Sequence, residues 1–162
     1  MEFYYPNFIN DHWRIVGEVF FGDKNHFVDM SQKCFRKEAI VAFLQEKGIA
    51  YYDTAEAVIR HKENASDAFL EVVEPTDIRA LLTRLPQCRA IVTTGEKACA
   101  TLCATFGVAT LPRPGTSALL PACQNASGEP LQLWRLPSSS RAYPLAFTAK
   151  VEAYRRMFDE VL

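Results

Sequence analysis

Three consecutive serines, Ser138–Ser140, stand between Pro137 and Pro144 and are followed directly by Arg141. Hydroxyls, backbone N–H groups and guanidinium groups are what proteins use to bind phosphate oxygens. The two prolines limit the conformational freedom of this serine loop (residues 137–144), which lowers the entropy cost of holding one shape. A flexible linker is the alternative, but a strongly periodic helical segment follows within a few residues. The pattern therefore favours a binding loop.

Asn10 is the second residue whose type fits a chemical role, because a side-chain amide can orient a water molecule without itself titrating. An apolar periodic segment begins here. We expect Asn7 to cap it, which would place Asn10 in the first helical turn beside free backbone N–H groups. The spacing leaves two roles open for Asn10, orienting a water or helping to cap the helix. Asp11 is a second candidate for the water and ranks lower.

Hydrophobic periodicity predicts the elements that must position these groups. Helices are expected near residues 9–20, 35–47, 78–85, 99–106 and 147–161. Strands are expected over residues 49–55, 89–94, 108–111 and 131–136. The polar stretch 60–71 and the Pro/Gly/Ser/Asn-rich stretch 112–130 are expected to be loops.

Short strands alternating with helices predict an α/β fold, a three-layer α/β/α sandwich with a small, mainly parallel central sheet. No composition shift marks a second boundary, so residues 1–162 are expected to form a single domain. In such sheets ligands bind outside the carboxyl ends of the strands. Asp53–Thr54, Thr94–Gly95 and the serine loop each follow a predicted strand, and we expect all three at one edge of the sheet.

The composition describes a globular chain, with 162 residues, 49% hydrophobic content and a formal net charge of −1. This excludes a protein coated in basic surface but allows a local basic face. No apolar run approaches the ~20 residues that a membrane span needs, and the N-terminus does not resemble a signal peptide. We therefore expect a cytoplasmic protein with no membrane partner, whose five cysteines are reduced thiols.

Other catalytic chemistries find no support in the sequence. The three serines do not form a G-x-S-x-G elbow. None of His12, His26 and His61 has a partner at metal-ligand spacing, and His12 is expected on a helix surface. Lys97, near a helix start, is expected to contact phosphate or to be a surface charge rather than to form a Schiff base. The sequence predicts neither a metal site nor a cofactor.

Four stretches of the chain resemble members of the uracil-DNA glycosylase superfamily. LPSSSRAYP resembles the second signature loop of the thymine-DNA and mismatch-specific branches. FYYPNFINDHWRI resembles a segment of these enzymes and of hypoxanthine-DNA glycosylases, with the N-x-x-W spacing met by Asn10 and Trp13. IVTTGEKA is similar to a strand-Gly-x-Lys-Ala stretch, and GIAYYDTA with NASD is similar to the hypoxanthine-type branch. The four occur in the expected order over nearly the whole chain.

The resemblance implies an α/β/α fold and a monofunctional DNA repair glycosylase. Such an enzyme hydrolyses the N-glycosidic bond of a flipped deaminated base, uracil or hypoxanthine, without metal or cofactor. The family's first motif, a strand and a Gly/Pro loop, is expected upstream of FYYP, where this sequence has nothing. Three alternatives stay open: an N-terminally truncated enzyme, a non-catalytic DNA- or nucleotide-binding relative, and a generic small-molecule α/β protein.

The resemblance also implies roles for single residues, with DNA as the partner and the oligomeric state left open. Asn10 would hold the attacking water. Tyr5 or Phe3 would stack on the flipped base, or else pack in the core, and Thr94 stands where relatives place an Asn that reads the base edge. The expected DNA contacts are Ser138, Ser139, Ser140, Arg141, Tyr143 and Lys97.

Overall fold

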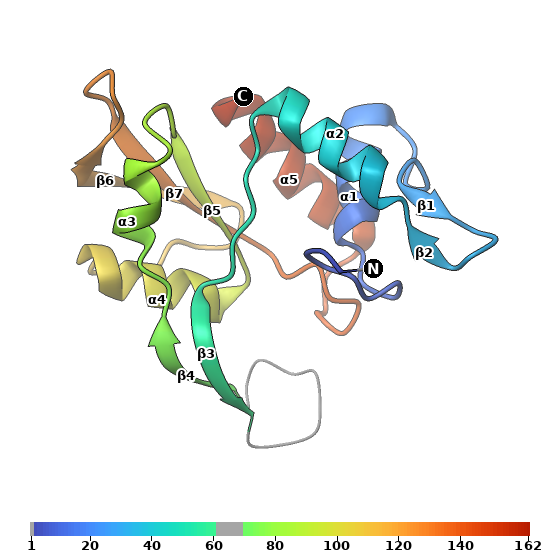
Figure 1. The fold of residues 1–162 in the computed structure, drawn as a ribbon, viewed down its shortest axis with the longest axis horizontal. Coiled ribbons are helices and arrows are strands. Elements are labelled where there is room, and N and C mark those ends of the chain that lie inside the picture. The colour runs from blue at the N-terminus through green and yellow to red at the C-terminus, as the bar shows by residue number, and fades with distance from the viewer. Residues whose placement is uncertain (1, 61–69) are drawn as a thin grey trace.

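The computed structural model describes residues 2–60 and 70–162 as a mixed α/β arrangement of helices around a small sheet. The helices are α1 (His12–Phe21), α2 (Lys37–Lys47), α3 (Ile78–Thr83), α4 (Glu96–Phe106) and α5 (Phe147–Val161). The strands are β1 (Val28–Asp29), β2 (Cys34–Phe35), β3 (Ala55–Arg60), β4 (Leu70–Pro75), β5 (Ala90–Thr94), β6 (Thr116–Gln124) and β7 (Pro130–Leu136). Figure 1 shows α1, α2 and α5 gathered to one side of β5 and β7.

The first helix begins at His12, later than the apolar periodicity predicts, with Asp11 at the N-cap. The reason is a tight turn made by Asn7, whose side chain accepts from the Ile9 N–H and whose carbonyl accepts from the Asn10 N–H. Such local bonds from Asn compete with helix formation. Ile9 consequently lies outside the helix and is 62% exposed, so the prediction of a helix that starts near residue 9 is wrong.

The larger sheet has three strands in the order β5-β7-β6. β5 runs parallel to β7, with Thr94 opposite Leu136, whereas β6 runs antiparallel to β7. The expectation of a mainly parallel sheet is therefore not met among the described residues. The difference arises because β6 forms within 112–130, a stretch that its turn-forming residues predict to be a loop.

The strand predicted over residues 108–111 is absent for a related reason. Gly107 ends α4 in the left-handed conformation, with φ of 69°, and the Val108 N–H donates to the Cys103 carbonyl. This arrangement caps the helix and uses the backbone group that a strand would need. Apolar composition alone could not distinguish a helix cap from a short strand.

β7 contributes side chains to two different hydrophobic clusters. Leu131 and Leu133 pack with Cys99 and Leu102 of α4. Trp134 and Leu136 pack instead with α1 and α5, on which the core side chains are Ile15, Val151, Tyr154, Met157 and Phe158. Because successive side chains of a strand point to opposite faces, β7 is covered by helices on both sides. Its carboxyl end therefore emerges between two packed layers.

A third cluster joins α1 to α2 and to the short β1–β2 hairpin. It contains buried Trp13 and Val16 of α1, with Phe27, Val28, Phe35, Ile40, Phe43 and Leu44. The predicted end of the second helix is confirmed, since Gly48 follows Lys47 with φ of 67° and its N–H bonds to the last-turn carbonyls. This cluster supports the N-terminal segment, because Phe3, Tyr5 and Phe8 pack against it.

β3 and β4 form an antiparallel hairpin apart from the larger sheet. The extended element expected over residues 49–55 is irregular backbone up to the start of β3 at Ala55. Most of the polar stretch 60–71, including the NASD residues, lies outside the described residues. None of the described helices is both long and apolar enough to cross a membrane.

Close packing of α1 against the turn that follows it gives a stability prediction. A Cβ at the buried Gly17 would lie 2.7 Å from the backbone oxygen of Asp23. We expect the resulting overpacking in Gly17→Ala to lower the free energy of unfolding by about 1–3 kcal/mol. Alanine's higher helix propensity, worth about 1 kcal/mol, acts in the opposite direction. The control Glu46→Ala, at an exposed site on α2, should change it by less than about 0.5 kcal/mol. Urea unfolding measures the free energy of unfolding of both variants. An unchanged free energy for Gly17→Ala would contradict this packing.

Candidate functional site

Three parts of the chain that are distant in sequence meet where β5 and β7 end. The Asp11 N–H donates to the Ser139 carbonyl at 3.2 Å, and the Gly95 N–H donates to the Leu136 carbonyl at 3.0 Å. The Tyr5 hydroxyl is hydrogen-bonded to the Thr94 hydroxyl. The N-terminal segment, the turn after β5 and the serine loop therefore form one corner of the molecule.

Asn10 lies directly before the N-cap of α1, and the expected place inside the first helical turn is wrong. Its side-chain oxygen accepts from the His12 N–H at 2.9 Å, and its backbone oxygen accepts from Arg14 Nη1 at 3.2 Å. The amide nitrogen of this half-buried side chain has no hydrogen-bond partner within the described residues. Asn10 is thus held through its side-chain oxygen and through its backbone oxygen, while the amide N–H groups and a second lone pair on Oδ1 stay available.

Asp11 is tied to the serine loop through its side chain as well as its backbone. Its carboxylate accepts from Arg141 Nε at 2.8 Å. Asp11 is buried, whereas about half of the Arg141 side chain is exposed, at 52%. The remaining guanidinium N–H groups of Arg141 can donate to a ligand, since Nε is only one of five donors. Asp11 is therefore better described as an anchor for Arg141 than as a group that holds water.

Turns within the serine loop use the serine oxygens as acceptors and leave hydroxyl protons to donate. Ser138 Oγ accepts from the Ser140 N–H, and Ser140 Oγ accepts from the Ala142 N–H, each at 3.2 Å. Both serines are half-buried. Ser139 differs, because it is only 2% exposed and its carbonyl accepts from the Asp11 N–H. Any contact of Ser139 with DNA would therefore be made by its backbone.

The aromatic candidates have different surroundings. Tyr5 adopts φ of 51°, rare for a residue with a side chain, and its ring stacks on His12 with the centroids 3.9 Å apart. Its hydroxyl reaches Thr94, so the structure brings these two candidates together. Phe3 stacks instead on Trp13, at 6.0 Å, and packs against the α1–α2 cluster. Phe3 is thus engaged in core packing.

Sequence reasoning missed the role of His12 and Tyr51. His12 is 3% exposed rather than on a helix surface, and its Nε2 is 2.6 Å from the Tyr51 hydroxyl. Burial lowers the pKa of His12 to about 3, so the ring is neutral at physiological pH. Its Nδ1 is buried and has no hydrogen-bond partner among residues 2–60 and 70–162. Tyr51 follows α2 in irregular backbone, and no periodic pattern in the sequence could have linked it to His12.

Arg14 was also missed, although it fixes the backbone before α1. Its guanidinium donates to the Phe8 carbonyl at 2.7 Å and lies 4.5 Å from the Phe8 ring centroid. Burial lowers the pKa of Arg14, Arg141 adds to this shift, and Asp11 opposes it. Arg14, Arg141 and Lys150 all act electrostatically on Asp11. This group carries more positive than negative charge, which favours an anionic ligand.

The remaining candidates lie at the edge of this corner. Lys97 is half-buried in the first turn of α4, two residues after Gly95. Tyr143 is half-buried in the serine loop, with its ring centroid 5.9 Å from the Lys150 ammonium. No group of three or more metal-ligating side chains occurs within residues 2–60 and 70–162.

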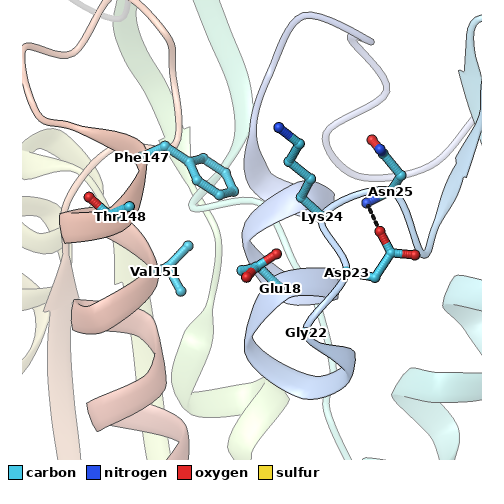
Figure 2. A pocket seen from close by; sticks show the side chains of 8 residues that line it. All are labelled: Glu18, Gly22, Asp23, Lys24, Asn25, Phe147, Thr148 and Val151. Atoms are coloured by element: carbon cyan, nitrogen blue, oxygen red, sulfur yellow. Dashed lines mark hydrogen bonds between the residues drawn. The ribbon is translucent and has the colours of Figure 1, made fainter.

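An open hollow lies elsewhere, between the later turns of α1 and the start of α5. Figure 2 shows its lining residues, with Phe147 and Val151 of α5 on the side toward Glu18 of α1. The hollow has a volume of about 500 Å³, and Lys24 and Asn25 border it. None of the residues predicted to form a site from the sequence lines it.

No protein family, curated protein or solved structure matches this chain.

The buried, neutral His12 gives a prediction for stability against pH. Unfolding returns its pKa from about 3 to 6.5, so below pH 6.5 the unfolded chain binds a proton that the folded chain does not. The stability that His12 contributes is therefore present above pH 6.5 and is lost as the pH falls toward 3. Between pH 7.5 and pH 5 the wild type should lose about 2 kcal/mol more unfolding free energy than His12→Gln.

Urea unfolding of both proteins at the two pH values measures this difference. Every other titrating group is shared, so the comparison isolates the His12 ring. Equal losses in the two proteins would show that His12 is not buried in its neutral form.

Proposed function

We propose that this chain is a monofunctional DNA glycosylase of the uracil-DNA glycosylase superfamily. It would hydrolyse the N-glycosidic bond of a flipped deaminated base, uracil or hypoxanthine, in DNA. The observation that carries the proposal is the hydrogen bond from the Asp11 N–H to the Ser139 carbonyl, which brings Asn10 beside the serine loop. These are two of the four stretches that resemble the superfamily, and neither periodicity nor chain order requires them to touch.

Hydrolysis of the N-glycosidic bond requires a water held against the sugar and hydrogen-bond donors that face the departing base. Breaking the bond builds oxocarbenium character on the sugar and negative charge on the base. Asn10 is fixed beside the N-terminus of α1 and would orient the water. The ring of Tyr5 would stack on the extruded base, and the Thr94 hydroxyl would contact its edge. Both would have to release the hydrogen bond that now joins them.

The phosphates flanking an extruded nucleotide would bind at the serine loop. The donors are the Ser138 and Ser140 hydroxyls and the exposed guanidinium of Arg141. The surplus of positive charge around Asp11 supports such binding in a chain whose net charge is −1. Flipping a base costs a few kcal/mol, which these contacts would have to offset.

The proposal also covers the layered architecture of the fold and the compartment in which the protein acts. Helices pack on both sides of β7, which supports a three-layer α/β/α sandwich formed by residues 1–162 as a single domain. The five cysteines are free thiols in the structure, which fits action in the reducing cytoplasm.

A non-catalytic DNA-binding protein is the second candidate, and two observations favour it. Tyr5 and Thr94, the groups expected to bind the base, satisfy each other in a hydrogen bond. The oxygen of Asn10 is likewise engaged by the His12 N–H. A binder would keep the phosphate contacts of the serine loop and would show salt-dependent affinity without turnover.

Labelled duplexes carrying uracil or hypoxanthine, followed by alkaline cleavage of abasic sites, test the reaction. The wild type should produce strand breaks at one of these lesions. Asn10→Ala should lower the single-turnover rate by about a hundredfold or more, the contribution typical of an acid–base or water-orienting group. Its affinity for DNA should stay close to that of the wild type.

Asn25→Ala is the matched control, because Asn25 is exposed and lies beyond the other end of α1. It should retain the wild-type rate. Salt-dependent binding with no strand breaks at either lesion would favour the non-catalytic binder, and the absence of both binding and cleavage would eliminate both candidates.

A further inference from the structure

Lys150 is a charged residue buried in the core behind the serine loop. It lies in the first turns of α5 and is only 2% exposed. Its ammonium donates to the Ser140 carbonyl at 2.7 Å. Burying an ammonium group is costly unless its surroundings compensate, so a lysine in this position calls for a local reason.

Direct neutralisation by a carboxylate does not supply that reason. No ion pair of Lys150 within 4.0 Å is found in the described part of the chain, and Asp11, which acts on it from further away, is bonded to Arg141. Burial lowers the pKa of Lys150, Asp11 opposes the shift and Arg141 adds to it. A methionine of similar volume would avoid the desolvation of an ammonium group. What the lysine contributes is its bond to the loop.

That bond fixes the orientation of one peptide plane. The Ser140 carbonyl accepts from both Lys150 Nζ and the Tyr143 N–H. In a trans peptide the carbonyl of one residue and the N–H of the next point in opposite directions. The structure contains no cis peptide among its described bonds. Because the Ser140 carbonyl points toward Lys150, the Arg141 N–H must point away from it.

The Arg141 N–H has no hydrogen-bond partner within the described residues. Beside it lie the Ser140 hydroxyl, which keeps a proton to donate, and the half-exposed Arg141 side chain. A backbone N–H, a hydroxyl and a guanidinium on adjacent residues can bind one phosphodiester group. The direction of the Arg141 N–H depends on the peptide plane that Lys150 holds.

We propose that Lys150 is a positioning residue that holds the Ser140–Arg141 peptide so that its N–H and the adjoining donors face a DNA phosphate. The inference rests on the proposed function for the identity of the ligand. It assigns Lys150 no contact with DNA, since its side chain is buried behind the loop. It also explains why the buried face of α5 carries an ammonium group, which packing alone would not require.

The test compares the wild type with Lys150→Met and with Lys47→Met, a control on helix α2. Hydrogen–deuterium exchange of residues 138–143 in the free protein reports on the loop without DNA. In Lys150→Met we expect exchange there to be about tenfold faster or more, the effect of losing a bond to a charged donor. The melting temperature should be unchanged or higher, because a buried charge has been removed.

In the same variant the dissociation constant for a lesion-containing duplex should rise about tenfold, with a smaller change in the single-turnover rate at saturating protein. If Lys150 merely stabilised the fold, replacing it would lower the melting temperature. The replacement would then not change the dissociation constant more than the single-turnover rate. Lys47→Met should match the wild type in every measurement. Lys150→Gln, which keeps a shorter donor, should fall between the wild type and Lys150→Met.

Unchanged loop exchange, or faster exchange with unaltered DNA affinity, would overturn the inference. Global unfolding of both Lys150 variants would overturn it too, since the role would then concern the whole fold. If the wild type binds DNA but cleaves no lesion, the proposed reaction fails, while weakened binding by Lys150→Met still supports the positioning role. If the wild type does not bind DNA at all, both proposals fail.

Discussion

The attachment of Asp11 to the serine loop is the constraint on which the whole site depends. Its N–H donates to the Ser139 carbonyl and its carboxylate accepts from Arg141, a residue 130 positions further along the chain. One residue thus fixes the N-terminus of α1 and the loop after β7 with two bonds. Closing so long a segment carries an entropy cost that grows slowly with its length, so a few such bonds, together with the packing of α1 on α5, can offset it. This attachment places Asn10, the residue before Asp11, beside the serine loop.

Part of this site could be predicted from the sequence, because some of its chemistry is concentrated in short stretches. The serine loop is recognisable from its prolines and hydroxyls, and Asn10 from its place before an apolar segment. The supporting groups could not be found in this way. His12, Tyr51 and Lys150 are polar or aromatic residues whose burial depends on packing between distant elements. A single sequence carries no local signal that distinguishes a buried lysine on an amphipathic helix from one that faces solvent.

The fold shows the same division between local and non-local information. Gly48 and Gly107 end their helices in the left-handed conformation, as glycines do, and strand β5 stands out through its β-branched residues. The strand β6 was hidden because proline, glycine and serine surround it, and its pairing with β7 is a tertiary contact that overrides local propensity. The prediction that the first helix starts near residue 9 is wrong because Asn7 forms its own turn.

The central claim is that the N-terminal segment and the serine loop form one surface for an extruded nucleotide. An NMR titration of the ¹⁵N-labelled chain tests it most directly, using a short duplex with a stable abasic-site analogue that cannot be cleaved. The account predicts that the amide signals of Asn10, Asp11, Ser140 and Arg141 shift together, with one dissociation constant that weakens as salt is added. Shifts confined to another face, such as the hollow beside Lys24, or two segments that respond with different dissociation constants, would contradict it.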